Sequence, residues 1–168
     1  PDGWAIAAGD RYLDVLLARA ARTVILTTER PIDECGLEAR YPDVHLLASY
    51  VDAVIVELGA NDALRGLPPP QARAALDGIL ARLAEKGRPT LVAGMRSPPN
   101  MGPDYVSAFD GMYPELAEKY QAILYPFFLD GVAADRSLNQ ADGIHPNPKG
   151  VDIIVSRILP SVEELIRK

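Results

Sequence analysis

A carboxylate and an imidazole stand close together in the stretch from Gln140 to Gly150. Asp142 comes three residues before His145, one of only 2 histidines in the sequence. A short loop before a helix can fold the Asp142 carboxylate onto one imidazole nitrogen, which fixes the tautomer and stabilises the imidazolium. The other nitrogen is then free to act as a general base. The alternative interpretation is a turn with an Asx-type hydrogen bond and a surface histidine.

A second polar group follows the clearest strand candidate, Val51 to Leu58. The amide of Asn61 could point into a cleft and donate to a developing oxyanion. In the alternative interpretation, Asn61 or Asp62 forms an Asx turn or caps the next helix. Ligand sites of parallel sheets lie at the carboxyl ends of the strands. The segments Gly59 to Asp62 and Arg96 to Asn100 are both expected at such ends.

Strand-like and helix-like patterns alternate along the chain. Strands are expected at Thr23 to Thr28, Val51 to Leu58, Thr90 to Met95 and Ala122 to Tyr125. Helices are expected at Tyr12 to Ala21, Val44 to Tyr50, Gln71 to Lys86, Tyr105 to Tyr120 and Gly150 to Leu159. This alternation predicts an α/β protein, a three-layer α/β/α sandwich with a central parallel sheet, as a single domain over residues 1–168.

Prolines and one long loop interrupt the expected elements. Pro114 is expected to start a new segment or to kink its helix, and Pro160 to interrupt the last helix before Ser161. The stretch from Pro126 to Asn147 is predicted to be a long loop. Long loops inside compact domains are usually functional, and this one contains the Asp142–His145 motif.

Composition excludes several classes of protein. The net charge of −6 argues against nucleic acid or an anionic membrane as the main partner. The single cysteine, Cys35, excludes an internal disulfide and a cysteine-rich metal site. No apolar run approaches the length of a membrane span. Because the chain begins at Pro1 rather than Met, we expect a processed or incomplete N-terminus, and a periplasmic or secreted location is favoured over the cytoplasm.

These motifs together resemble the SGNH (GDSL-type) esterase and lipase family, close to its bacterial thioesterase I and arylesterase branch. The resemblance covers Val51 to Lys168, and the matching segments are Gly59 to Asp62 (Gly-x-Asn-Asp), Pro98 to Pro103 with Tyr105 after it, and Asp142 to His145 (Asp-x-x-His). It implies a flavodoxin-like fold and acyl transfer to water by a Ser-His-Asp triad, with no cofactor and no metal. The resemblance implies that His145 is the base, that Asp142 orients it, and that Asn61 donates to the oxyanion.

The resemblance implies a small-molecule acyl or aryl ester, or a thioester, as substrate, of the lysophospholipid or acyl-CoA type. The acyl pocket is expected between the loops Leu64 to Pro70, Arg96 to Pro103 and Phe127 to Leu138, with Ile144, Leu64 and Pro99 as contacts. The alternative is a catalytically inactive domain of this family that binds an acylated ligand. A nucleotide-binding flavodoxin-like protein is a weaker alternative, because no Gly-x-Gly-x-x-Gly or P-loop motif is present.

The nucleophile of the family pattern is not visible in the sequence. The first family block ends in Gly-Asp-Ser, but here Gly9-Asp10 is followed by Arg11, whose guanidinium cannot attack an acyl carbon. The glycine of the second block has no counterpart between Glu29 and Glu34. Residues 1–50 therefore match the family poorly.

Three explanations remain open. The first block could precede Pro1, Gly9-Asp10-Arg11 could be a degenerate block, or the first residues could be wrongly assigned, and we favour the first or the third. Ser137 is the best substitute among the visible serines because it shares the long loop of His145. Cys35 has no evident basic partner, and His45 is interpreted as structural.

Overall fold

A computed structural model describes residues 23–26 and 52–168 of the chain. Several predictions lie outside these residues: the first two helices, the blocks at Arg11 and at Glu29 to Glu34, and the interpretations of Cys35 and His45.

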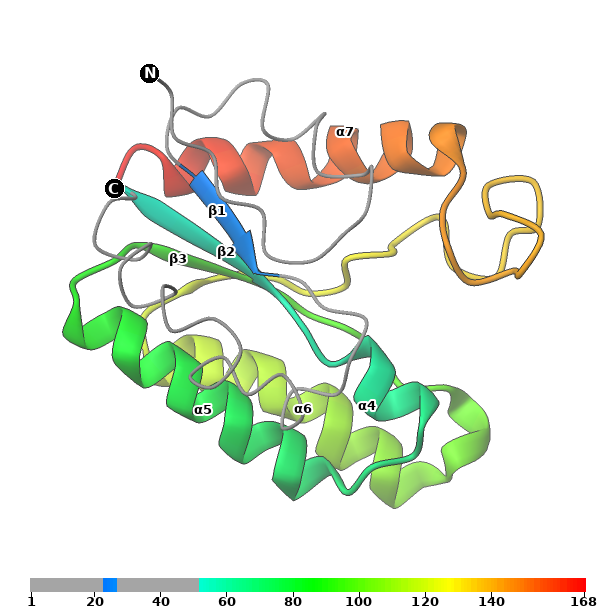
Figure 1. Cartoon of the computed structure of the whole chain (residues 1–168), viewed down its shortest axis with the longest axis horizontal. Coiled ribbons are helices and arrows are strands. Elements are labelled where there is room, and N and C mark those ends of the chain that lie inside the picture. Colours follow the sequence, from blue (N-terminus) through cyan, green and yellow to red (C-terminus); the bar gives the residue numbers. More distant parts are fainter. Residues whose placement is uncertain (1–22, 27–51) are drawn as a thin grey trace.

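The described part is built on a parallel sheet of 4 strands in the order β1-β2-β3-β4. The strands are β1 (Thr23–Leu26), β2 (Ala53–Glu57), β3 (Thr90–Ala93) and β4 (Ile123–Tyr125). Each neighbouring pair is parallel, and Leu26 is in register with Val56. All four expected strands are therefore present, and β2, β3 and β4 are each shorter than the sequence pattern suggested. Their carboxyl ends share one edge of the sheet, on the right in Figure 1.

Helices cover both faces of this sheet, which confirms the three-layer α/β/α prediction (Figure 1). The helices are α4 (Ala60–Leu64), α5 (Pro69–Glu85), the 3-10 turn η1 (Pro99–Met101), α6 (Pro103–Lys119) and α7 (Pro148–Leu165). Successive strand side chains point to opposite faces. Val54 and Val56 thus join one core with α5 and α6, whereas Ala53 and Ile55 join a second core with α7.

Neither Pro114 nor Pro160 ends its helix, so the predicted new segment at Pro114 and the predicted interruption at Pro160 are wrong, whereas a kink at Pro114 stays a prediction. Helix α6 continues through Pro114, and α7 continues through Pro160 and begins at Pro148 rather than Gly150. A proline inside a helix costs about 3 kcal/mol, because it removes one backbone hydrogen bond and crowds the preceding turn. Both prolines lie on exposed positions, where water can hydrate the freed carbonyl. Burial of Leu116 after the first proline and of Leu165 after the second offsets that cost.

The long loop from Pro126 to Asn147 holds no helix or strand, as predicted, apart from one isolated antiparallel bridge between Asn139 and Pro146. It leaves the carboxyl end of β4 and leads into α7. Helix α7 begins with Asn147 as its N-cap, whose side chain accepts from the backbone N–H groups of Lys149 and Gly150. The loop is therefore anchored to the sheet at one end and to a capped helix at the other.

Candidate active site

The Asp142 carboxylate folds back onto His145. Asp142 Oδ2 lies 2.8 Å from His145 Nδ1. Asp142 Oδ1 accepts the backbone N–H groups of Ile144 at 2.9 Å and of His145 at 3.0 Å. A carboxylate oxygen only accepts hydrogen bonds, so Nδ1 carries the proton and Nε2 is the free nitrogen of the neutral ring. The hydrogen bond expected from the Asp-x-x-His spacing is present, together with the Asx turn offered as its alternative.

This geometry keeps the Asp142 carboxyl ionised. The backbone N–H of His145, then its imidazole, then the backbone N–H of Ile144 lower the pKa of Asp142 from 3.8 to about 2. The side chains of His145 and Asp142 are 48% and 43% exposed, so a substrate can approach the imidazole directly. An ionised carboxylate on Nδ1 and an accessible Nε2 are what a general base of this type requires.

A network of amide side chains shapes the loop that carries the pair. Asn139, which is buried, donates to the carbonyls of Val132 and Asp135. Asn147 donates to the carbonyls of Ser137 and Asn139 while it caps α7. Sequence reasoning assigned no role to these asparagines. For Asn147 a local signal existed, because an Asn directly before a Pro is a pattern typical of a helix start.

Asn61 lies at the carboxyl end of β2, inside the short helix α4. Gly59, with φ 107°, occupies the N-cap position of that helix, so neither Asn61 nor Asp62 is the cap. Since β2 and β4 are separated by β3, their carboxyl ends are about 10 Å apart at the usual strand spacing. The sheet thus places Asn61 and the start of the His145 loop at one edge.

The expected substrate contacts all lie on the surface of the described structure. Leu64, at the end of α4, and Ile144, beside His145, are 54% and 48% exposed, and both are large apolar side chains. Pro99 is also exposed and opens η1 after β3. Their elements follow the carboxyl ends of β2, β3 and β4, and their contact with a substrate stays a prediction.

No serine hydroxyl within residues 52–168 is hydrogen-bonded to His145. The hydroxyls of Ser97, Ser137 and Ser156 instead contact Asp110, Asp135 and the carbonyl of Asp152. Ser137 is the substitute nucleophile considered from the sequence, and both its hydroxyl and its backbone N–H donate to Asp135 Oδ1. The described part of the chain therefore contains the Asp142–His145 pair without a serine hydroxyl bonded to it.

The described residues hold no group of three or more His, Cys, Asp and Glu side chains arranged for a metal ion. Among the same residues, no helix has both the length and the apolar character needed to cross a membrane.

A parallel α/β/α sandwich with a carboxylate-oriented imidazole at the carboxyl edge of its sheet is the arrangement found in α/β hydrolytic enzymes. The family model described as GDSL-like Lipase/Acylhydrolase matches residues 2–153. The chain belongs to this family, which confirms the resemblance seen in the motifs.

Similar proteins carry esterase names. Esterase TesA of Pseudomonas aeruginosa is 36% identical over 113 residues, which cover 67% of this chain and 56% of that protein. The arylesterase of Vibrio mimicus is 40% identical over 98 residues, or 58% of this chain and 49% of that protein. Thioesterase 1/protease 1/lysophospholipase L1 of Escherichia coli K12 is 36% identical over 113 residues, which cover 67% of this chain and 54% of that protein. The chain spans about half the length of the curated relatives it matches.

Solved structures show the same relationship. The crystal structure of TesA superposes with a TM-score of 0.71 at 34% identity, covering 79% of this chain and 73% of that one. The psychrotrophic esterase EstA from Pseudoalteromonas sp., inhibited by monoethylphosphonate, gives a TM-score of 0.76 at 27% identity, with 94% and 86% covered. AlinE4, an SGNH-hydrolase family esterase, superposes with a TM-score of 0.56 at 45% identity, covering 73% of this chain and 67% of that one.

Proposed function

We propose that this protein hydrolyses carboxylic esters or thioesters of acyl or aryl groups through a Ser-His-Asp acyl-enzyme mechanism. The observation that carries the proposal is the 2.8 Å contact between Asp142 Oδ2 and His145 Nδ1 in an exposed loop. Membership of the GDSL-like family supports it. So do the names of the relatives, which include esterase, arylesterase, thioesterase and lysophospholipase.

In the proposed reaction, His145 Nε2 takes the proton of a serine hydroxyl as that oxygen bonds to the acyl carbon. Asn61 donates to the resulting oxyanion, and Asp142 stabilises the imidazolium. The bond to the leaving alkoxide or thiolate then breaks, and the leaving group takes the proton from His145. Water, deprotonated by the same nitrogen, attacks the acyl carbon and releases the acid and the serine.

The strand topology supports the proposal by bringing the candidate groups to one edge of the sheet. Strand β1 pairs with β2 in parallel, so its carboxyl end at Leu26 shares the edge with Gly59 and Asn61. The loop of His145 leaves the same edge, at the carboxyl end of β4, so a nucleophile carried at this edge would be consistent with the proposed mechanism. The exposed apolar side chains of Leu64 and Ile144 favour an acyl or aryl group over a sugar.

A fluorophosphonate probe with intact-mass spectrometry and peptide mapping tests the proposal. The probe reacts with activated serines, and we expect a stoichiometric adduct on the unchanged protein, with the modified peptide identifying the nucleophile. His145→Ala should abolish both the adduct and the turnover of p-nitrophenyl esters, whereas Ser137→Ala should retain both. Unchanged turnover in His145→Ala would remove His145 from the mechanism. Binding of an acylated ligand with neither adduct nor turnover would instead indicate an inactive binding domain.

A further inference from the structure

Three aromatic residues form a column along one side of α6. Tyr105, Phe109 and Tyr113 follow one another at intervals of four residues, so they share one face of the helix. The rings of Tyr105 and Phe109 are stacked at 6.0 Å, and those of Phe109 and Tyr113 meet edge to face at 5.7 Å. Phe109 and Tyr113 are 0% and 1% exposed. Rings buried and packed in this way present their polar tips in fixed places.

Both hydroxyls of this column hold the segment that follows β2. Tyr113 donates to the carbonyl of Leu58 at 2.9 Å, and Tyr105 donates to the carbonyl of Leu67 at 2.8 Å. These carbonyls lie on either side of α4, the short helix that contains Asn61. The aromatic column therefore fixes the chain before and after Asn61, from a helix more than 40 residues further along the sequence.

Gly59 shows how closely the column controls this turn. Its φ of +107° lies in the left-handed region, where a side chain would be strained. A Cβ at this position would meet the Tyr113 hydroxyl at 2.2 Å and Phe109 Cζ at 3.5 Å. The backbone at Gly59 thus lies directly against the phenol of Tyr113. The direction in which the chain enters α4 depends on that contact.

We propose that Tyr113 is a positioning residue that sets the place of the Asn61 amide for the oxyanion. This inference rests on the proposed function, in which Asn61 is the donor. A donor to a developing charge must be held within a fraction of an ångström, because its contribution falls steeply with misplacement. Without its hydroxyl, Tyr113 would leave the buried carbonyl of Leu58 unpaired and the entry to α4 free to shift.

Tyr113→Phe tests this inference in the full chain, with Tyr120→Phe as the matched control. Tyr120, at the end of the same helix, loses a hydrogen bond of 2.9 Å to Asp77 Oδ1 instead. We expect Tyr113→Phe to lower kcat about tenfold with KM unchanged, since one oxyanion donor contributes about 10²–10³-fold and is here misplaced rather than removed. Tyr120→Phe should stay close to the unchanged protein in both constants.

A double-mutant cycle separates positioning from general weakening of the fold. If Tyr113 acts through Asn61, Tyr113→Phe should cause no further loss of kcat in the Asn61→Ala background. Losses that multiply in the double variant would overturn the inference, as would a kcat in Tyr113→Phe equal to that in Tyr120→Phe.

A second readout does not depend on turnover, so it distinguishes failure of this inference from failure of the proposed function. The side-chain amide signals of Asn61 in ¹⁵N NMR spectra, assigned by their loss in Asn61→Ala, should broaden or double in Tyr113→Phe and stay unchanged in Tyr120→Phe. An inactive protein with this response refutes the proposed function and retains the positioning role. Unchanged Asn61 signals in Tyr113→Phe overturn the positioning role, whatever the activity.

Discussion

The two oxygens of Asp142 serve different groups. Oδ1 is occupied by the backbone N–H groups of Ile144 and His145, and Oδ2 faces His145 Nδ1. The carboxylate is thus held by the backbone of the loop, independently of the imidazole ring. A carboxylate fixed in this way imposes both the orientation and the tautomer of the ring, and its anchor does not depend on long-range packing.

Asp142→Asn is predicted to lower kcat for an ester by about 10⁴-fold, because an amide NH₂ facing Nδ1 favours the wrong tautomer. The lowered pKa of Asp142 sets the pH range of this effect. The carboxylate acts fully above its ordinary value of 3.8, and its effect is lost only as the pH falls towards about 2. The Asp142 carboxyl is ionised above about pH 5, so kinetic assays of both proteins from about pH 5 to about pH 8 should show the loss throughout that range.

Asp135→Asn is the control for this prediction. Asp135 is in the same loop and also accepts a backbone N–H, that of Ser137, but it has no contact with His145. Its replacement should change kcat by no more than about twofold. Equal losses in the two variants would mean that the loop as a whole, rather than the carboxylate on Nδ1, determines activity.

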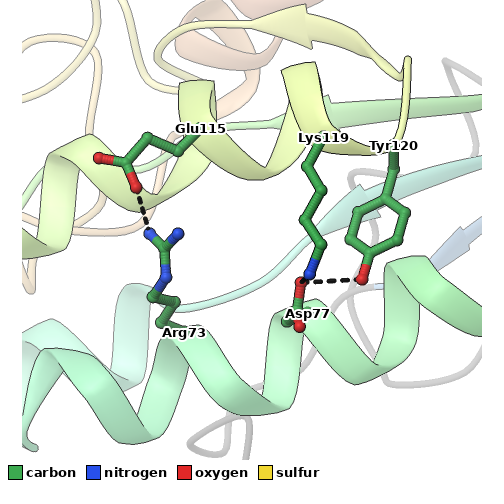
Figure 2. A network of polar contacts seen from close by, with 5 residues as sticks. All are labelled: Arg73, Asp77, Glu115, Lys119 and Tyr120. Carbon is green, nitrogen blue, oxygen red and sulfur yellow. Dashed lines mark hydrogen bonds and ion pairs between the residues drawn. The ribbon is translucent and has the colours of Figure 1, made fainter.

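Helices α5 and α6 are joined by a buried apolar contact and, above it, by exposed polar pairs. Figure 2 shows the polar contacts: Arg73 Nη1 to Glu115 Oε2 and Lys119 Nζ to Asp77 Oδ1, each at 2.6 Å, and Tyr120 to Asp77. Leu76 on α5 is fully buried in the core beneath them. Exposed ion pairs contribute little because water screens them, so the apolar layer holds these helices together.

Leu76→Ala is accordingly predicted to lower the free energy of unfolding by about 2–5 kcal/mol, as expected for a buried leucine. Asp77→Asn should have a far smaller effect, which shrinks further as salt is added. The hydrogen bond from Lys119 lowers the pKa of Asp77, so this small contribution is present near neutral pH and disappears on acidification through that pKa. Urea unfolding of both variants measures these free energies, and an equal loss of unfolding free energy in Leu76→Ala and Asp77→Asn would contradict the prediction.

At the scale of the whole molecule, the two halves of the proposed site belong to opposite faces of the sheet. Asn61 sits on α4, whose Ala63 packs in the core shared with α5 and α6. The loop of His145 is continuous with α7, whose Ile158 packs in the core on the other face. Strands β2, β3 and β4 lie between them (Figure 1). The sheet is therefore the element that fixes the separation between His145 and Asn61, the proposed base and the proposed oxyanion donor.

Ile158→Ala is predicted to destabilise the protein by about 2–5 kcal/mol, since the side chain is fully buried against the sheet. Both cores share the same strands, so unfolding should remain a single transition, with coincident near-UV and far-UV circular dichroism curves in urea. Separate transitions would show that the α7 layer unfolds independently. In that case the sheet would not couple the two halves of the site.

Local patterns by themselves determined much of this protein. Runs of β-branched and apolar residues predicted all four strands, and the i, i+3, i+4 spacing predicted α5, because period and composition act over a few neighbouring residues. The Asp142–His145 hydrogen bond was predictable for the same reason, since its partners are three residues apart. The predicted helix breaks at Pro114 and Pro160 are absent, because burial of the following turns outweighs the local preference of proline.

Only the tertiary structure decided how these pieces are held. The Tyr113 hydroxyl reaches the carbonyl of Leu58 across 55 residues, and the Asn147 amide reaches back 10 residues to that of Ser137. No local sequence pattern predicts such a contact, because it depends on how two elements pack and not on the residues beside either partner. The sequence therefore determined which groups could do chemistry. Packing on the two faces of one sheet decided where they stand, since only the fold brings distant backbone carbonyls and buried hydroxyls together.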